Sequence, residues 1–194
     1  MNRLAQVTLL VIVWSCAAFA TSIGFTETIT ATGTIGSTSF SDANMTIRGF
    51  GSEARVVHLG GNLYSLDLSY VTITIQGVGT FRITTPTRFF ANGVVVGFSH
   101  AGANGDDLID GPGISQVWDM KTSLGPITGG GEISDWDQSV VMSSGGRIVL
   151  NDDGFPMTFS ATVGAQAPEP ATICLFVTGL GGIGTKFLLR RRRK

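Results

Sequence analysis

The sequence has little charge and very few cysteines. Of its 194 residues, 14% are Asp, Glu, Lys or Arg, two are cysteines, and no heptad repeat of apolar residues is present. The missing heptads exclude a coiled coil. The 43% share of hydrophobic residues excludes a disordered chain. These exclusions leave a single folded domain with special segments at its two ends.

Basic residues are scarce in the middle of the chain. Residues 21–166 contain six basic and 13 acidic side chains, which gives a net charge of −7, whereas the last nine residues hold six of the 13 Lys and Arg. A body this acidic excludes duplex nucleic acid as a partner. Both cysteines, Cys16 and Cys174, lie outside the body. The body therefore folds without a disulfide, on core burial alone.

The first 20 residues have the pattern of a secretory signal peptide. A single positive charge at Arg3 precedes an apolar run at residues 9–14, and the small-residue triplet Ala18-Phe19-Ala20 follows. This order predicts cleavage after Ala20, so that Thr21 becomes the new N-terminus. The alternative is an uncleaved anchor, but the apolar run is shorter than the roughly 20 residues that span a bilayer.

The body, residues 21–163, has the pattern of an all-β domain. Short runs alternate between β-branched or aromatic residues and polar residues, as in residues 26–32 and 66–75. Glycine clusters separate such runs, as at Gly60-Gly61 and Gly129-Gly130-Gly131. We find no segment of helical period. The pattern predicts an antiparallel β-sandwich of about eight to ten strands.

An acidic segment of the body is a weak candidate for calcium binding. Residues 102–110 fit one copy of a calcium-binding nonapeptide with one substitution, and Asp106, Asp107 and Asp110 are its carboxylates. A single copy lacks the ligands that a second copy supplies, so such a site would be weak. The favoured interpretation is a plain surface loop, because Asn, Gly and Asp favour turns. We expect no cofactor and no other metal.

Aromatic side chains offer a second, equally weak indication of binding. On a β surface they can stack on sugar rings, although large aromatic residues are usually buried in the core. Core packing is therefore the favoured interpretation, and a carbohydrate- or calcium-binding module is the alternative. The residues concerned are Tyr64, Tyr70, Trp118 and Trp136.

Residues suited to catalysis are few. Glu132, Asp135 and Asp137 lie close enough in sequence for a glycosidase-like carboxylate pair, but charged strand edges also explain them. His58 and His100 have no Cys or second His at ligand spacing. No nucleophile elbow or phosphate-binding loop is present. We therefore expect a protein without enzymatic activity.

The chain closes with three segments in a fixed order. A linker at residues 164–170 contains Pro168-Glu169-Pro170, residues 171–189 are largely apolar, and residues 190–194 are all basic. Proline cannot continue a strand ladder, so the linker should be an accessible extended peptide. A helix over the apolar segment would be about 28 Å long, which matches a hydrocarbon core of roughly 30 Å. The basic residues hold the tail in the cytoplasm, with the body outside.

This tripartite C-terminus resembles the PEP-CTERM sorting signal over about the last 28 residues. The resemblance implies processing by exosortase, an integral-membrane cysteine transpeptidase. It implies that Pro168, Glu169 and Pro170 are the recognition residues, and that the span holds the precursor transiently in the inner membrane of a Gram-negative bacterium. The protein would then reach the cell surface or an extracellular matrix such as a biofilm, where polysaccharide is a potential partner. The stop after the span would be formed by Arg190, Arg191, Arg192 and Arg193.

Overall fold

The computed structural model describes residues 21–102, 105–134, 136, 140–151 and 155–164. These residues form 13 β-strands and one 3-10 turn, and they contain no α-helix. The predicted antiparallel all-β body is confirmed. The strands are more numerous than the predicted eight to ten, because glycine-rich and short segments without clear alternation also join the sheet.

The strands of the first half are β1 (Ser22–Ile35), β2 (Thr38–Ser52), β3 (Val57–Gly60), β4 (Leu63–Asp67), β5 (Tyr70–Ile75) and β6 (Gly79–Arg82), with the 3-10 turn η1 (Glu53–Arg55) after β2. Those of the second half are β7 (Thr87–Ala91), β8 (Val95–His100), β9 (Asp107–Gly113), β10 (Leu124–Ile133), β11 (Val141–Ser143), β12 (Gly146–Leu150) and β13 (Phe155–Val163).

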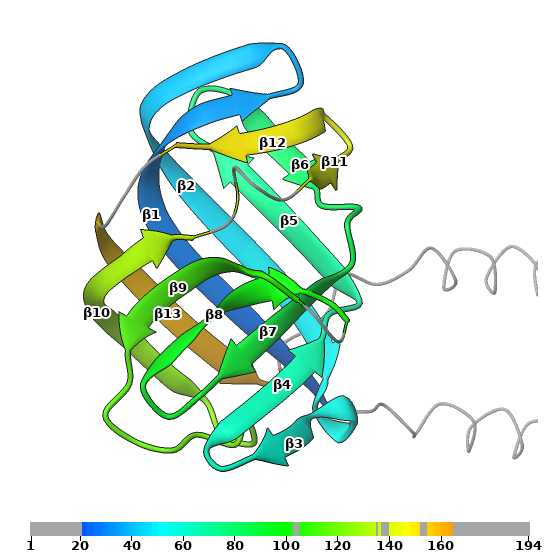
Figure 1. Ribbon diagram of the computed structural model, residues 1–194, viewed down its shortest axis with the longest axis vertical. Helices are drawn as coiled ribbons and strands as arrows, with labels where there is room; N and C mark the ends of the chain where they lie inside the picture. Colours follow the sequence, from blue (N-terminus) through cyan, green and yellow to red (C-terminus); the bar gives the residue numbers. More distant parts are fainter. Residues whose placement is uncertain (1–20, 103–104, 135, 137–139, 152–154, 165–194) are drawn as a thin grey trace, which may run out of the picture.

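One continuous hydrogen-bonded sheet forms both layers of the body. The strands pair in the order β3-β4-β7-β8-β9-β10-β13-β1-β2-β5-β6, and β12 pairs with β1 and β11. Strand β10 connects the layers, since its first part pairs with β13 while Glu132 and Ile133 pair with β9. Figure 1 shows β4, β7, β8 and β9 lying over β1, β2 and β13. The layers of the predicted sandwich are therefore two halves of one folded sheet.

Strands β1 and β2 form the long hairpin on which the rest of the sheet is built. Their pairing extends from Ser22 opposite Ser52 to Ile35 opposite Thr38. Gly36, at φ 58°, supplies the left-handed conformation that the tight turn requires. Along β1 every second residue from Ile23 to Ile35 is buried. This alternation gives β1 one face toward the core and one outward face of largely threonine side chains.

A stack of aromatic rings joins the two layers. The ring centroids of Phe25 in β1 and Phe89 in β7 lie 3.9 Å apart, and those of Phe89 and Phe159 in β13 lie 5.4 Å apart. Trp118 packs edge-on against all three rings. Because these contacts connect three strands from both layers, they form the centre of the core.

Two details of the sequence interpretation are wrong. The alternating run at residues 66–75 is not one strand, because Leu68 and Ser69 carry the chain from one layer to the other, and the Leu68 N–H donates to the Thr87 carbonyl at 2.9 Å. The segment interpreted as a surface loop places Asp107 and Asp110 in β9, since Leu108 and Ile109 between them are buried.

Several predictions fall on residues outside the described ones. These are the signal peptide with its cleavage site at Ala20, the Pro168-Glu169-Pro170 motif, the span at residues 171–189 and the basic tail at residues 190–194. Within the described part of the chain, no helix combines the length and the hydropathy that crossing a bilayer requires.

Replacing Phe89 with alanine should strongly destabilise the body. The change removes the ring in the middle of the stack, and buried Phe→Ala changes typically lower the free energy of unfolding by about 3–5 kcal/mol. Val94→Ala is the control, because Val94 is 68% exposed, and it should change the value by less than about 0.5 kcal/mol. Urea unfolding of the full chain in mild detergent measures both, and similar midpoints for the two variants would contradict the packing.

Candidate functional site

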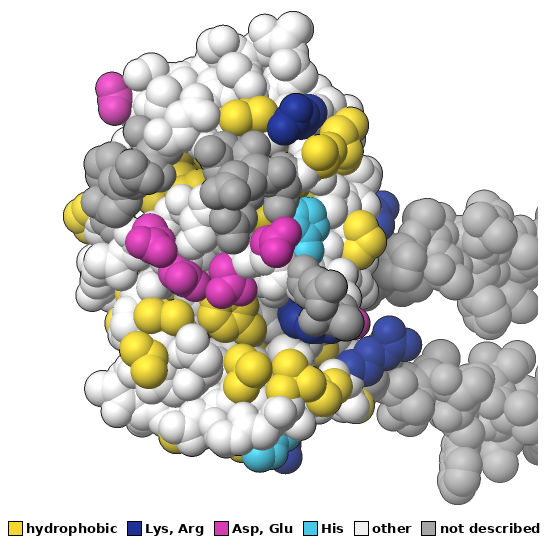
Figure 2. Space-filling view, viewed as in Figure 1, with side chains coloured by type: hydrophobic (Ala, Val, Ile, Leu, Met, Phe, Trp, Pro, Cys, Tyr) yellow, Lys and Arg dark blue, Asp and Glu magenta, His cyan; other side chains and the backbone are white. Residues whose placement is uncertain are grey.

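A row of acidic side chains lies on the surface of the layer that contains β9. Asp107 and Asp110 come from β9, and Glu132 of β10 lies directly opposite Asp110 in the ladder. Asp106 immediately precedes β9. Figure 2 shows acidic side chains in a row across this face, with a histidine at one end of the row. Pairing of β9 with β10 therefore gathers carboxylates that the sequence separates by more than 20 residues.

The pKa of Asp110, in this row, is raised by burial and by neighbouring negative charges. Burial, followed by the charges of Asp107 and Glu132, raises the pKa of Asp110 from 3.8 to about 6. One of its carboxylate oxygens, Oδ1, is buried without a hydrogen-bond partner among the described residues. Asp110 is therefore poised between its protonated and ionised forms near neutral pH.

Glu27 lies behind this row, inside the core. Its position on β1 belongs to the buried face, and the side chain is only 1% exposed. Neither carboxylate oxygen has a hydrogen-bond partner among the described residues. Desolvation, and secondarily the charge of Asp110, raises the pKa of Glu27 well above its ordinary value of 4.5. The neutral acid is thus the favoured form of Glu27 in the folded body.

A glycine makes room for the Glu27 carboxyl group. A Cβ atom on Gly111 of β9 would overlap Oε1 of Glu27 and would lie 2.9 Å from the Val96 carbonyl oxygen. Any larger residue at position 111 would therefore displace the acid or the neighbouring strand. The absence of a side chain lets the Glu27 carboxyl group reach the backbone of β9 across the core.

Two buried nitrogen atoms also lack partners among the described residues. They are Nε2 of His100, at the end of β8, and Nε1 of Trp136. Buried polar atoms of this kind are rare in folded proteins, and each calls for a physical explanation. Together with the oxygens of Glu27 and Asp110, they show that unsatisfied polar groups lie inside an otherwise apolar core.

The described residues do not form a metal centre. They contain no group of three or more His, Cys, Asp or Glu side chains that could hold a metal ion. Asp106, Asp107 and Asp110 therefore gain no support as calcium ligands. The sequence also suggested a carboxylate pair among Glu132, Asp135 and Asp137. Of these, Glu132 joins the acidic row, while Asp135 and Asp137 lie outside the described residues.

The tryptophans proposed for sugar stacking are core residues. Trp118 is 3% exposed and donates from Nε1 to the Thr122 carbonyl at 2.9 Å, and Trp136 is 1% exposed. Tyr64 is partly buried, with its ring stacked on His58 at a centroid distance of 4.6 Å. Core packing, the favoured interpretation of the sequence, is therefore confirmed for both tryptophans.

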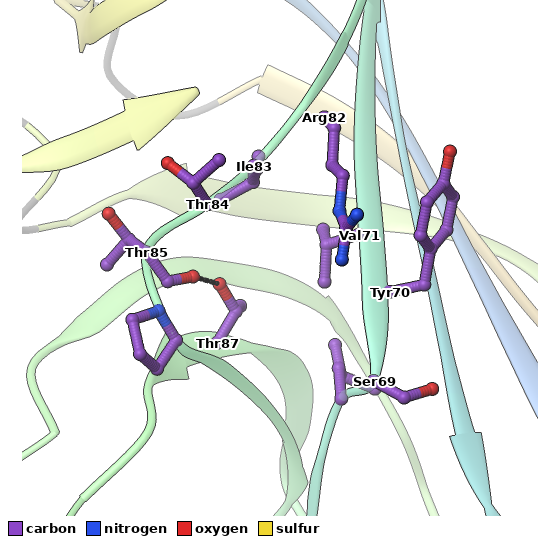
Figure 3. A pocket seen from close by; sticks show the side chains of 10 residues that line it. Ser69, Tyr70, Val71, Arg82, Ile83, Thr84, Thr85 and Thr87 are labelled. Carbon is purple, nitrogen blue, oxygen red and sulfur yellow. Dashed lines mark hydrogen bonds between the residues drawn. The ribbon is translucent and has the colours of Figure 1, made fainter. Parts of the chain in front are cut away.

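A hollow of about 230 Å³ opens beside Tyr70, where the chain passes between the layers. Figure 3 shows Arg82 on one side of it and Thr85 and Thr87 on the other. The Arg82 guanidinium carbon lies 5.1 Å from the centre of the Tyr70 ring. The Thr87 hydroxyl donates to the Thr85 carbonyl at 2.9 Å, and the Ser69 hydroxyl donates to a β2 carbonyl at 3.0 Å. A ligand in the hollow would thus meet the Arg82 cation and the Tyr70 ring, while the Thr87 and Ser69 hydroxyls already donate to backbone carbonyls.

Comparison with known proteins identifies the C-terminus. The family model of the PEP-CTERM protein-sorting motif matches residues 166–193. No curated protein and no solved structure matches the chain significantly. The C-terminus of the chain therefore carries a PEP-CTERM sorting motif. This motif supports an exported protein that exosortase sorts from a membrane-anchored precursor.

Sequence reasoning found the sorting motif but missed Glu27. Every second residue of a strand points to the same face, so in the alternating run of residues 26–32 Glu27 shares the apolar face with Ile29 and Ala31. This position on the apolar face is the sequence signal that indicates a buried acid. The partners that make the position unusual, Asp110 and Gly111, are more than 80 residues away and become visible only through the fold.

Gly111→Ala should destabilise the body by about 1–3 kcal/mol, because the new methyl group overlaps the Glu27 carboxyl group. Gly113→Ala on the same strand is the matched control. The nearest atom to its new Cβ would be the Val94 carbonyl oxygen at 3.5 Å, an ordinary contact. Urea unfolding of the two full-length variants gives the comparison, and equal loss of stability in both would show that Gly111 has no special role.

Proposed function

We propose that this protein is a non-enzymatic module of the cell surface or extracellular matrix. It is cleaved after Ala20 during export, held transiently in the inner membrane by residues 171–189, and released when exosortase processes the segment around Pro168-Glu169-Pro170. The observation that carries the proposal is the sorting motif at residues 166–193. The folded part that would be delivered is the acidic all-β body.

The geometry of the body suits this route, because its two ends lie together. Strands β1 and β13 pair, with Ile23 opposite Val163, and the Gly164 N–H donates to the Ser22 carbonyl at 2.8 Å. The last strand thus ends before the Pro-Glu-Pro motif. Cleavage beyond residue 164 would therefore remove none of the described strands from the sheet, and the body would leave the membrane folded.

The distribution of charge supports the same route. Residues 21–166 carry a net charge of −7, while the terminal basic residues belong to the tail that processing removes. A body whose net charge is far from zero stays soluble once it is released. The delivered protein would accordingly have a lower isoelectric point than the value of 6.1 for the whole chain.

Replacing Pro168, Glu169 and Pro170 by alanine should prevent C-terminal processing. In cells that contain exosortase, the unchanged protein should appear at the surface or in the medium without its span, and the triple variant should keep the span and remain in the membrane. Intact-mass measurement of both fractions shows which form is present. Val94→Ala, on the exposed surface of the body and outside residues 166–193, serves as the control and should be processed normally. A span retained equally in the unchanged protein and the variant would disprove the processing step.

Association with extracellular polysaccharide is a second candidate function. The observation that favours it is the hollow beside Tyr70, where Arg82 supplies a cation next to an aromatic ring. Such a site suits an acidic sugar, whose carboxylate pairs with a guanidinium group. Tyr70→Ala should then lower retention of the full chain on immobilised acidic polysaccharide several-fold, while Tyr64→Ala should not. Equal retention of both variants and the unchanged protein would remove this candidate.

A further inference from the structure

The middle of β1 places an acid where the fold provides only apolar neighbours and other acids. Within its own layer Glu27 lies opposite Ile47 of β2 and Phe159 of β13. Across the core its carboxyl group meets the backbone at Gly111 of β9. The side chain therefore stands at the contact between the two layers, with Asp110 as its nearest acidic neighbour along β9.

No cation on the neighbouring strands faces Glu27. Strand β13 has no charged residue, and the charged residues of β2, Asp42 and Arg48, are exposed on the other face. Strand β8 contributes only His100, at its far end. Within the described residues, the one ion pair joins Arg88 of β7 to Asp67 at 2.8 Å.

Strands β9 and β10 contribute only negative groups. Strand β9 carries Asp107 and Asp110, and β10 carries Glu132. An ionised Glu27 would thus be a buried charge with no donor and no counter-ion among these strands. Such a charge is strongly unfavourable, and the group takes up a proton instead. Two carboxyl groups in one site also resist ionising together, because like charges repel.

We propose that the Glu27 and Asp110 carboxyl groups form a proton-dependent latch between β1 and β9. While the pair holds its protons, the two layers pack closely through Gly111. Loss of the protons places negative charge at the layer contact and weakens it. The body is therefore a pH-sensitive module that is held most firmly in mildly acidic surroundings. The latch concerns the delivered body and does not depend on how the protein is sorted.

The direction of the pH dependence follows from proton binding. In the unfolded chain the two groups titrate near their ordinary pKa values of 4.5 and 3.8, whereas in the folded chain the pKa of Asp110 is about 6 and that of Glu27 is well raised. The folded state binds more protons between these values, so stability falls as the pH rises through that window. Above the folded-state pKa values the loss is complete and stability no longer changes with these groups.

Urea unfolding of the full chain in mild detergent, followed by tryptophan fluorescence between about pH 4 and pH 8.5, tests the latch. A pKa difference of one between folded and unfolded states changes the folding constant tenfold. The raised pKa of Asp110 alone would therefore change the folding constant by at most roughly 100-fold across this range. Solvent screening makes the change smaller, because the side chain is partly exposed. We expect the folding constant of the unchanged protein to fall at least about tenfold across this range.

Variants separate the latch from general effects of pH. Glu27→Gln should flatten the profile and raise stability at about pH 8, and Asp110→Asn should flatten it in part. Asp42→Asn, which removes an exposed carboxylate, should leave the profile unchanged. If the Glu27→Gln protein does not fold, Glu27→Met provides an uncharged side chain of similar size.

Each outcome of these measurements decides for or against the latch. A flattened profile in either Glu27 variant, with the Asp42→Asn profile unchanged, supports it. A profile that is the same in the Glu27 and Asp110 variants as in the unchanged protein overturns it. If neither Glu27 variant folds, the Asp110→Asn profile alone decides in the same way. A pH dependence that millimolar calcium abolishes in the unchanged protein also overturns it, because the pair would then hold a cation instead of protons.

Discussion

Contact between the inner face of β1 and the strands of the opposite layer is the constraint on which the body depends. Strand β1 pairs with β2, β12 and β13, so it holds one layer together. Its inward side chains then meet the other layer, Phe25 through the ring of Phe89 and Glu27 through Gly111. One of these contacts is apolar and strong, whereas the other depends on a carboxyl group remaining neutral. The same strand therefore provides an aromatic contact and a buried carboxyl group at the boundary between the layers.

The fold and the sorting signal are built for separate tasks. In the described body, the pairing of β1 with β13 and the hydrogen bond from the Gly164 N–H to the Ser22 carbonyl hold the two ends together. The sorting motif begins at residue 166. The last described strand, β13, ends at Val163, ahead of the matched residues. Under the proposed function, a membrane enzyme would act on the chain beyond this strand.

Sequence reasoning was reliable where the pattern is local. Alternation in residues 26–32 identified a strand, and the order of proline, apolar span and arginines identified the C-terminal signal. It was unreliable where burial depends on partners far along the chain. Asn, Gly and Asp at residues 102–110 predict a loop, although Leu108 and Ile109 anchor the first part of β9 in the core. Glu27 escaped notice for the same reason, since only the fold brings it to Asp110.

A carbon NMR titration would show whether the folded body contains a neutral glutamic acid at position 27. The chain has four glutamates, so selective labelling of the glutamate side-chain carboxyl carbons in the full chain gives few signals, and Glu27→Gln assigns the one of interest. If Glu27 is neutral in the folded body, its signal should titrate with a midpoint well above 4.5. A midpoint at or below 4.5, in protein that is still folded, would contradict it.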